Sequence, residues 1–124
     1  MQRRDFIKLL SAAALTVAMP PSIRDSIVER TFGNSETLPD NITAGYIQVG
    51  PKRIVQWGQV ILERSGAADV IFPMEMYSTL LGKALSSVDG EVVHIRTITP
   101  KSMRVFATPG ARVLWVCLGE TWGR

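Results

Sequence analysis

Between residues 44 and 119, short apolar runs alternate with turn-forming residues. Apolar and polar positions alternate within the runs, as they do in β-strands with one face toward a core. Seven segments are predicted as strands: residues 44–49, 53–63, 69–72, 83–87, 91–98, 102–107 and 112–118. Turns at intervals of about 8 to 12 residues are typical of a sandwich. The pattern predicts an all-β fold, a small antiparallel β-sandwich preceded by an N-terminal helical segment.

The side chains of segment 53–63 divide between two faces of the predicted strand. Val55 and Trp57 lie on one face, and Gln56 and Gly58 lie on the other. Antiparallel sheets commonly pack one face on a core and leave the other in water. We therefore expect one dry face and one wet face.

The pair Asp89-Gly90 lies between two apolar runs and is the strongest hairpin signal in the chain. In segment 91–98, which follows it, Val93 is expected to point toward the core and His94 toward solvent. The sequence therefore predicts a tight reversal of the chain at this position.

The first 43 residues do not share the strand pattern. We divide the chain into an N-terminal helical anchor or signal-like segment (1–33), a polar linker (34–43) and the β-sandwich domain (44–124). The basic start and the apolar run 9–19 resemble a twin-arginine export signal. That run is shorter than the ~20 residues that cross a membrane. Alternatively, the segment is an amphipathic helix that docks on a partner protein. The residues on which both interpretations depend are Arg3, Arg4, Phe6, Ile7, Leu9 and Leu10.

A second helix is predicted after two consecutive prolines, with Ser22 as its N-cap and Gly33 at its end. About ten residues are too few for a helix to be stable alone in water, so its apolar face needs a partner. Helices from neighbouring copies of the chain would provide one.

Composition limits how the domain can be stabilised. Of the 124 residues, 46% are hydrophobic and 20% are charged, as in ordinary globular proteins. Roughly 80 residues remain for the core, and a core of that size rarely supplies more than ~3–5 kcal/mol alone. The only cysteine is Cys117 and the only histidine is His94, so the chain can form neither an internal disulfide nor a closed zinc site. We expect self-association, and no metal or cofactor.

Neither the charge distribution nor the residue types point to nucleic-acid binding or catalysis. The net charge of +3 is modest and the basic residues are scattered among strands, as on a solvated surface rather than a nucleic-acid patch. His94 is expected to face solvent, Cys117 to be a small buried hydrophobe, and Asp89 and Glu91 to be solvated near a turn. A hydrolase would need an acid pair about 5–10 Å apart in a cleft. We predict neither enzyme activity nor a nucleic-acid partner.

Aromatic and methionine side chains are the candidates for recognition. Trp57 and Trp115 lie in mid-strand among apolar neighbours, so we expect them in the core or at a subunit interface. Loops on rigid sheets often carry recognition, and methionine adapts to varied partners. The residues predicted to contact a receptor are Met74, Met76, Tyr77 and Trp122.

Five stretches, taken in order, resemble the C-terminal domain of bacteriophage tail fibres: residues 45–50, 53–58, 68–74, 101–106 and 113–119. In that family a strand ending in Gln-Trp-Gly comes first, as at 56–58 here. A Phe-Pro turn follows, and a closing strand carries an aromatic residue before a small residue and Gly. The resemblance covers about residues 44–119.

The resemblance implies a homotrimeric β-sandwich at the tip of a virion fibre. Such a domain binds a polysaccharide or protein receptor on the host surface and performs no chemistry. The N-terminal segment would attach it to other tail or capsid proteins. The chain differs from the family in lacking the long repetitive shaft and in having a signal-like start. An alternative is therefore a non-enzymatic binding module, exported by the twin-arginine route to the periplasm or cell surface.

Overall fold

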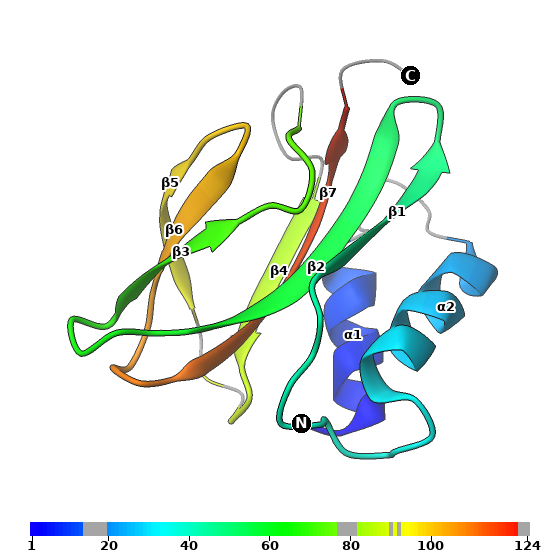
Figure 1. The fold of residues 1–124 in the computed structure, drawn as a ribbon. Helices are drawn as coiled ribbons and strands as arrows, with labels where there is room; N and C mark the ends of the chain where they lie inside the picture. Colours follow the sequence, from blue (N-terminus) through cyan, green and yellow to red (C-terminus); the bar gives the residue numbers. More distant parts are fainter. Residues whose placement is uncertain (14–19, 77–81, 90, 92, 122–124) are drawn as a thin grey trace.

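The computed structural model describes residues 1–13, 20–76, 82–89, 91 and 93–121. These residues form three layers, which Figure 1 shows side by side. One layer holds the helices α1 (Arg3–Ala13) and α2 (Pro21–Phe32). The middle layer is an antiparallel sheet in the order β1 (Gly45–Gly50), β2 (Arg53–Ile61), β7 (Arg112–Glu120) and β4 (Gly82–Ser87). The third layer is an antiparallel sheet in the order β3 (Ala67–Ile71), β6 (Ser102–Phe106) and β5 (His94–Ile98).

The predicted fold class is confirmed, and each of the seven expected segments overlaps a strand. The hairpin predicted at Asp89-Gly90 is wrong. β4 pairs with β7 in one sheet, whereas β5 pairs with β6 in the other, so the chain changes sheets between these strands. Gly90 itself lies outside the described residues. A turn signal indicates that the chain reverses, but it does not say which strands pair.

Both faces of β2 are buried, which corrects the prediction of a wet face. Val55 and Trp57 lie in a core beneath the helices. Their neighbours Ile54 and Gln56 are buried on the opposite side, which faces the three-stranded sheet. The sheet lies between two covering layers, so residues 54–58 of this strand are buried on both faces.

Helix α2 starts at Pro21 and has no side-chain cap, so the predicted cap by Ser22 is wrong. Proline suits the first helical position because it has no N–H to leave unpaired. The predicted end at Gly33 is confirmed. Gly33 has a φ of 59° and its N–H donates to the carbonyl O of Glu29 at 2.7 Å.

The two helices find their apolar partners within the same chain. Phe6 and Leu10 of α1 lie in one core cluster with Ile27 and Phe32 of α2 and with side chains of β2 and β7. The rings of Phe6 and Phe32 are 5.5 Å apart between centroids. The partner that the apolar face of α2 needs is thus α1 and the sheet, and helices from neighbouring copies are not required for it.

The polar segment 34–43 is tied to the start of the chain. The N–H of Leu38 donates to the carbonyl O of Met1 at 2.9 Å, and Gln2 forms an antiparallel bridge with Thr37. Residues 1–13 are therefore held both by packing on the sheet and by backbone hydrogen bonds.

Two glycines allow the buried tryptophans to approach the backbone. A Cβ added at Gly45 would lie 2.5 Å from Cζ2 of Trp57, and one added at Gly58 would lie 2.8 Å from Cζ2 of Trp115. Both distances are shorter than a carbon contact allows. In the Gln-Trp-Gly sequence, Trp57 places its indole on the helix side of the sheet. Gly58, which follows it, leaves space on the opposite side for the indole of Trp115.

Replacing Gly58 by alanine is expected to lower the free energy of unfolding by about 1–3 kcal/mol, because the new methyl group must displace a buried indole. Gly50→Ala is the matched control, since a Cβ there meets nothing within 4 Å. We expect it to change stability by less than ~0.5 kcal/mol. Urea denaturation followed by tryptophan fluorescence measures both variants. Equal stability of the two would contradict the packing role of Gly58.

Candidate recognition surfaces

Gln56 is the polar centre of the region between the sheets. Its side chain is 0% exposed. Nε2 donates to the carbonyl O of Met74 at 2.8 Å, and the N–H of Met74 donates to Oε1 at 2.7 Å. Both backbone groups of Met74 are thus satisfied by one amide, which fixes the loop after β3 to the middle of β2. The sequence did not reveal this role, because Gln56 occupies a strand position that alternation assigned to solvent.

The same loop is also fastened to the turn between β5 and β6. The N–H of Phe72 donates to the carbonyl O of Lys101 at 2.9 Å, and the N–H of Met76 donates to that of Pro100 at 2.8 Å. Segment 72–76 therefore sits on a rigid support between the two sheets.

The structure distributes the predicted receptor-contact residues differently. Met74 is half-buried, whereas Met76 is only 1% exposed and belongs to the core between the sheets. The structure thus places Met76 in the interior and not on the surface. Tyr77 and Trp122 lie outside the described residues.

The two mid-strand tryptophans are buried by their own chain, at 2% exposure each. Trp57 lies on the helix side, where the Arg30 guanidinium is 5.9 Å from its ring. Trp115 faces the second sheet and meets the ring of Phe72 edge-on at 5.8 Å. Both indoles contribute to the interior of a single subunit.

The candidate anchor residues divide into a buried and an exposed set. Phe6 and Leu10 are buried, Ile7 and Leu9 are partly buried, and Arg4 is exposed.

Arg3, the first of the two arginines, has a structural role. Its Nη2 donates to the carbonyl oxygens of Gly33 at 2.7 Å and Ser35 at 2.9 Å, and its guanidinium lies 5.7 Å from the centre of the Phe32 ring. These contacts join the start of α1 to the end of α2. Neither helix is long and apolar enough to span a membrane.

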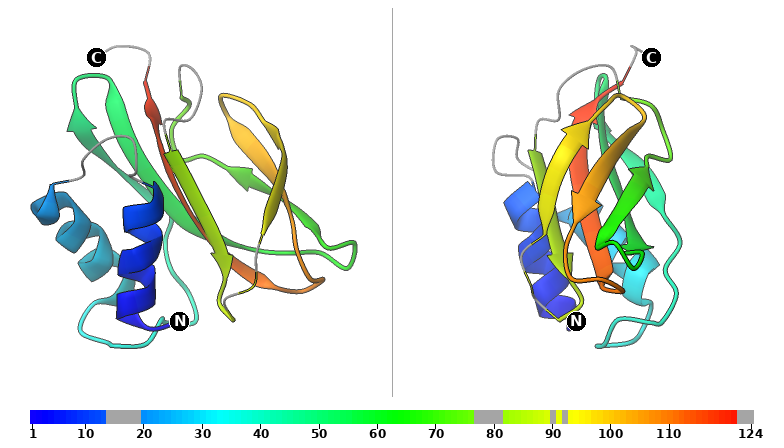
Figure 2. Two further views of the ribbon diagram at one scale, coloured as in Figure 1. Left: turned by 180° about the vertical axis from the view of Figure 1, so that it is seen from behind. Right: turned by 90° about the vertical axis from the view of Figure 1, so that its left-hand side faces the viewer.

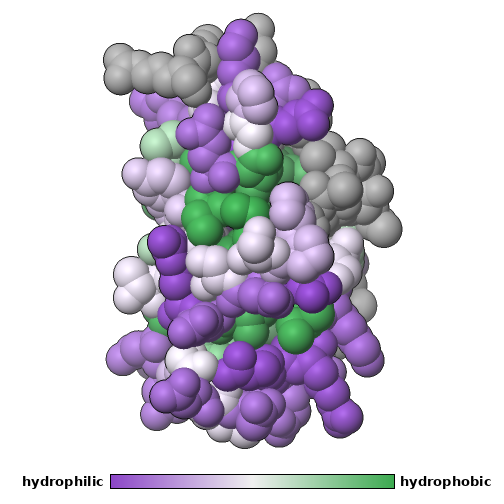
Figure 3. All heavy atoms as spheres, turned by 90° about the vertical axis from the view of Figure 1, so that its right-hand side faces the viewer, coloured by the Kyte–Doolittle hydropathy of each residue, from purple (hydrophilic) through white to green (hydrophobic). Residues whose placement is uncertain are grey.

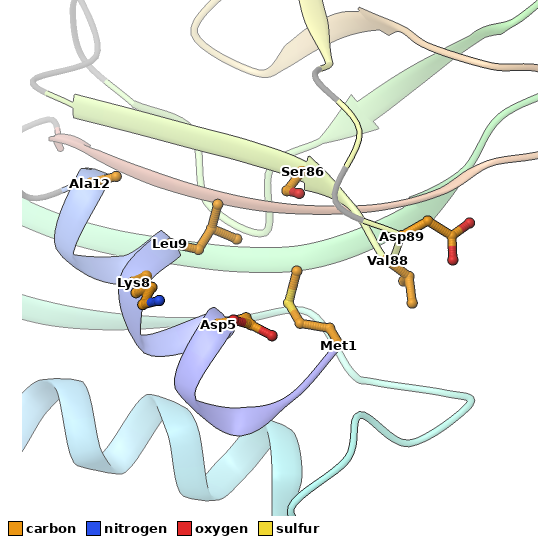
Figure 4. Close-up of a pocket in the computed structure, with 8 residues that line it drawn as sticks. All are labelled: Met1, Asp5, Lys8, Leu9, Ala12, Ser86, Val88 and Asp89. Carbon is orange, nitrogen blue, oxygen red and sulfur yellow. The ribbon is translucent and has the colours of Figure 1, made fainter.

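A groove of about 500 Å³ runs between α1 and the end of β4. Figure 4 shows its lining: Met1, Asp5, Lys8, Leu9, Ala12, Ser86, Val88 and Asp89. Asp89 therefore borders a concave surface, while Glu91 accepts a hydrogen bond from Oγ1 of Thr108 at 2.7 Å. Both acids are exposed, as predicted, although their neighbours differ.

The side of the molecule that carries α2 and β1 is viewed in Figure 3. Over the described residues, its hydrophobic surface is divided into separate patches by polar side chains. Ile47 and Val49 of β1 and Ile23 of α2 are partly buried against the helix-side core. Large continuous apolar patches mark protein interfaces, and this side presents only small ones.

The cysteine and the histidine lie in different environments. Cys117 is fully buried, and burial raises the pKa of its thiol to about 12, although Lys83 acts in the opposite direction. The prediction that Cys117 is a small buried residue is confirmed. His94 is exposed, as expected. Within the described part of the chain, no three potential metal ligands come together.

The outer face of the three-stranded sheet carries a cationic and aromatic cluster that the sequence did not reveal. The guanidiniums of Arg96 and Arg104 lie 5.1 Å and 5.8 Å from the centre of the Phe106 ring. Nη1 of Arg104 also donates to Oδ1 of Asp69 at 3.0 Å. The four residues come from three strands, so only the pairing register brings them together.

Comparison with solved structures identifies the architecture. The described fold matches an N-truncated R2-type pyocin tail fibre with a TM-score of 0.54 and 16% identity. It matches a C-terminal part of the R2 pyocin fibre of P. aeruginosa with a TM-score of 0.52 and 17% identity. The chain has the fold of a tail-fibre segment. Each match covers 85% of this chain, but only 45% and 30% of the respective fibre chains.

The tail-fibre resemblance predicted from the ordered motifs is confirmed at the level of fold. No family model matches the sequence, and no curated protein matches it. At 16–17% sequence identity, this chain and the pyocin fibres share their architecture. The match extends beyond the 44–119 region, because 85% coverage of the chain must include part of the N-terminal residues.

Replacing Gln56 by glutamate is expected to destabilise the protein by about 3–5 kcal/mol at pH 7, because a buried carboxylate would face the Met74 carbonyl unpaired. Burial would raise the carboxyl pKa above its value in the unfolded chain. The loss of unfolding free energy should therefore become smaller as the pH falls toward 5, because the protonated carboxyl can again donate to the Met74 carbonyl. Urea midpoints across this pH range measure the effect.

Gln59→Glu is the matched control for this change. Oε1 of Gln59 already accepts a hydrogen bond from Nε of Arg112, and a carboxylate can do the same. The control should keep wild-type stability at pH 7. A Gln56→Glu variant with the same pH profile as the control would show that the amide does not clamp the loop.

Proposed function

We propose that this protein is a structural and attachment component of a virion or phage-tail-like particle. In this role its strand domain forms a tail-fibre or spike-like knob that binds a receptor on the host cell surface. The single observation that carries the proposal is the match of its fold, over 85% of the chain, to pyocin tail fibres.

The chemistry of the described residues supports binding rather than catalysis. The buried thiol of Cys117 and the isolated His94 offer no nucleophile–base pair, and the described part of the chain gathers no metal ligands. Segment 72–76 is held by the Gln56 amide and by the β5–β6 turn. Loops fixed on a rigid sheet are suited to recognition at low entropic cost.

The position of α1 supports a role for residues 1–13 in the mature protein. Phe6 and Leu10 are part of the core, so removal of a signal segment would uncover Val55 and Trp57 of the sheet. The particle interpretation therefore agrees better with the fold than the alternative of a twin-arginine-exported module. The exposed residues Arg4 and Lys8 remain available to contact other virion tail or capsid proteins.

Self-association completes the proposal. The tail-fibre resemblance implies a homotrimer. Several linked binding sites strengthen attachment to a repetitive surface. The exposed large hydrophobic side chains that a neighbouring copy can cover are Tyr46, Ile61, Ile71 and Ile98. The proposed partners are thus the chain itself, other particle proteins, and a host-surface polysaccharide or protein, without nucleic acid.

Purified full-length protein is expected to be a trimer and to be retained by cells of a susceptible bacterial strain. Light scattering at micromolar concentration measures the first property, and cosedimentation of fluorescently labelled protein with a panel of strains measures the second. An unrelated protein of equal size and charge is the control. A monomer, or retention no greater than that of the control on every strain, would contradict the proposal.

Phe6→Ala is expected to lower the free energy of unfolding by about 3–5 kcal/mol, because it opens a cavity beneath the sheet. Arg4→Ala, on the exposed side of the same helix, should change it by less than ~0.5 kcal/mol. Intact mass of the assembled protein should include residues 1–13. A mature mass without them, together with wild-type stability of Phe6→Ala, would support the exported module instead.

A further inference from the structure

The outer face of the three-stranded sheet is open. In the right-hand view of Figure 2, β5, β6 and β3 lie in front and no helix crosses them. Phe106 pairs with His94 of β5 on one side and with Ala67 of β3 on the other. Its ring is only partly buried on this face, where a sheet with one face on the core normally presents polar side chains.

A register shift in β5 concentrates charge around this ring. The pairing with β6 is interrupted between Ile95 and Thr97, so Arg96 and Thr97 both lie near Arg104. Such bulges redirect a side chain and often occur beside functional sites. Here the bulge places a second guanidinium within 5.1 Å of the Phe106 ring centre.

The two arginines differ in how their charge is balanced. Arg104 is paired with Asp69 at 3.0 Å, so its charge is compensated. Arg96 contacts the Phe106 ring, and no carboxylate of the described residues forms an ion pair with it. Arg96 is exposed beside the ring, so its N–H groups can donate to an anion in bidentate geometry.

We propose that this face binds the anionic group, carboxylate or phosphate, of an acidic polysaccharide, with Arg96 as the anion-binding residue and Phe106 as its support. The inference rests on the proposed attachment function. A sheet face that no helix covers suits a repeating chain better than a small molecule, which needs a pocket. His94 and Thr97 provide neighbouring groups for sugar hydroxyls. A single uncompensated arginine is too little charge for nucleic acid, which needs a basic stripe.

Binding of immobilised polygalacturonate and phosphomannan to the full-length protein tests the inference, with neutral dextran and polyglutamate as comparison polymers. We expect one or both acidic polysaccharides to bind, dextran not to bind, and polyglutamate to bind at least tenfold more weakly. The polymer that binds distinguishes carboxylate from phosphate. Equal binding of polyglutamate would overturn the assignment to a sugar, and binding to neither acidic polysaccharide would overturn the inference.

Arg96→Gln is expected to weaken binding about tenfold or more, because it removes a charge-assisted bidentate contact. Phe106→Leu keeps an apolar side chain but removes the ring, and should weaken binding severalfold. Arg64→Gln, at an exposed arginine outside this face, is the matched control and should bind as wild type. Urea midpoints verify that all three variants fold. Wild-type affinity of folded Arg96→Gln would overturn the inference.

Retention by bacterial cells separates this inference from the attachment proposal. If wild-type protein is retained by cells but binds neither acidic polysaccharide, the attachment function stands and the assigned face is wrong. If an acidic polysaccharide binds through Arg96 but no strain retains the protein, the binding site stands and the attachment function fails.

Discussion

The antiparallel pairing of β2 with β7 is the constraint on which the rest of the structure depends. These nine-residue strands pair along their full length, with Trp57 opposite Val116 and Gly58 opposite Trp115. Trp57 of β2 therefore lies on the helix side of the sheet, and Trp115 of β7 lies on the side of the three-stranded sheet. The residues adjacent to each tryptophan in the sequence point to the opposite side. The helices cover one face and the three-stranded sheet covers the second. A chain without an internal disulfide thus obtains two core clusters from one central ladder, which offsets the small size of each.

A polar side chain within this interior fixes the loop that follows β3. The amide of Gln56 is costly to bury alone, but it satisfies both backbone groups of Met74. The loop, which also hydrogen-bonds to the β5–β6 turn, is thereby positioned against the central strand. These hydrogen bonds offset the conformational entropy that the loop loses when it is ordered.

The N-terminal residues show how one pattern serves two purposes. A basic start followed by a short apolar run fits an export signal, and it equally fits an amphipathic helix that covers a sheet. Composition alone does not separate these cases. In the structure Arg3 joins the ends of the two helices, and Phe6 is buried beneath the sheet. The same residue types therefore act in intramolecular packing, which accounts for the pattern without a membrane.

Local alternation in the sequence determined the existence and approximate bounds of the strands, the burial of Cys117 and the order of the tail-fibre-like motifs, because periodicity and turn chemistry act over a few residues. Tertiary structure alone decided that β4 pairs with β7 and not with β5, that the middle of β2 is buried on both faces, and that Gln56 points inward. It also brought Arg96 to the Phe106 ring. These features depend on contacts between residues far apart in the chain, and no local pattern encodes which distant backbone or ring will be the partner.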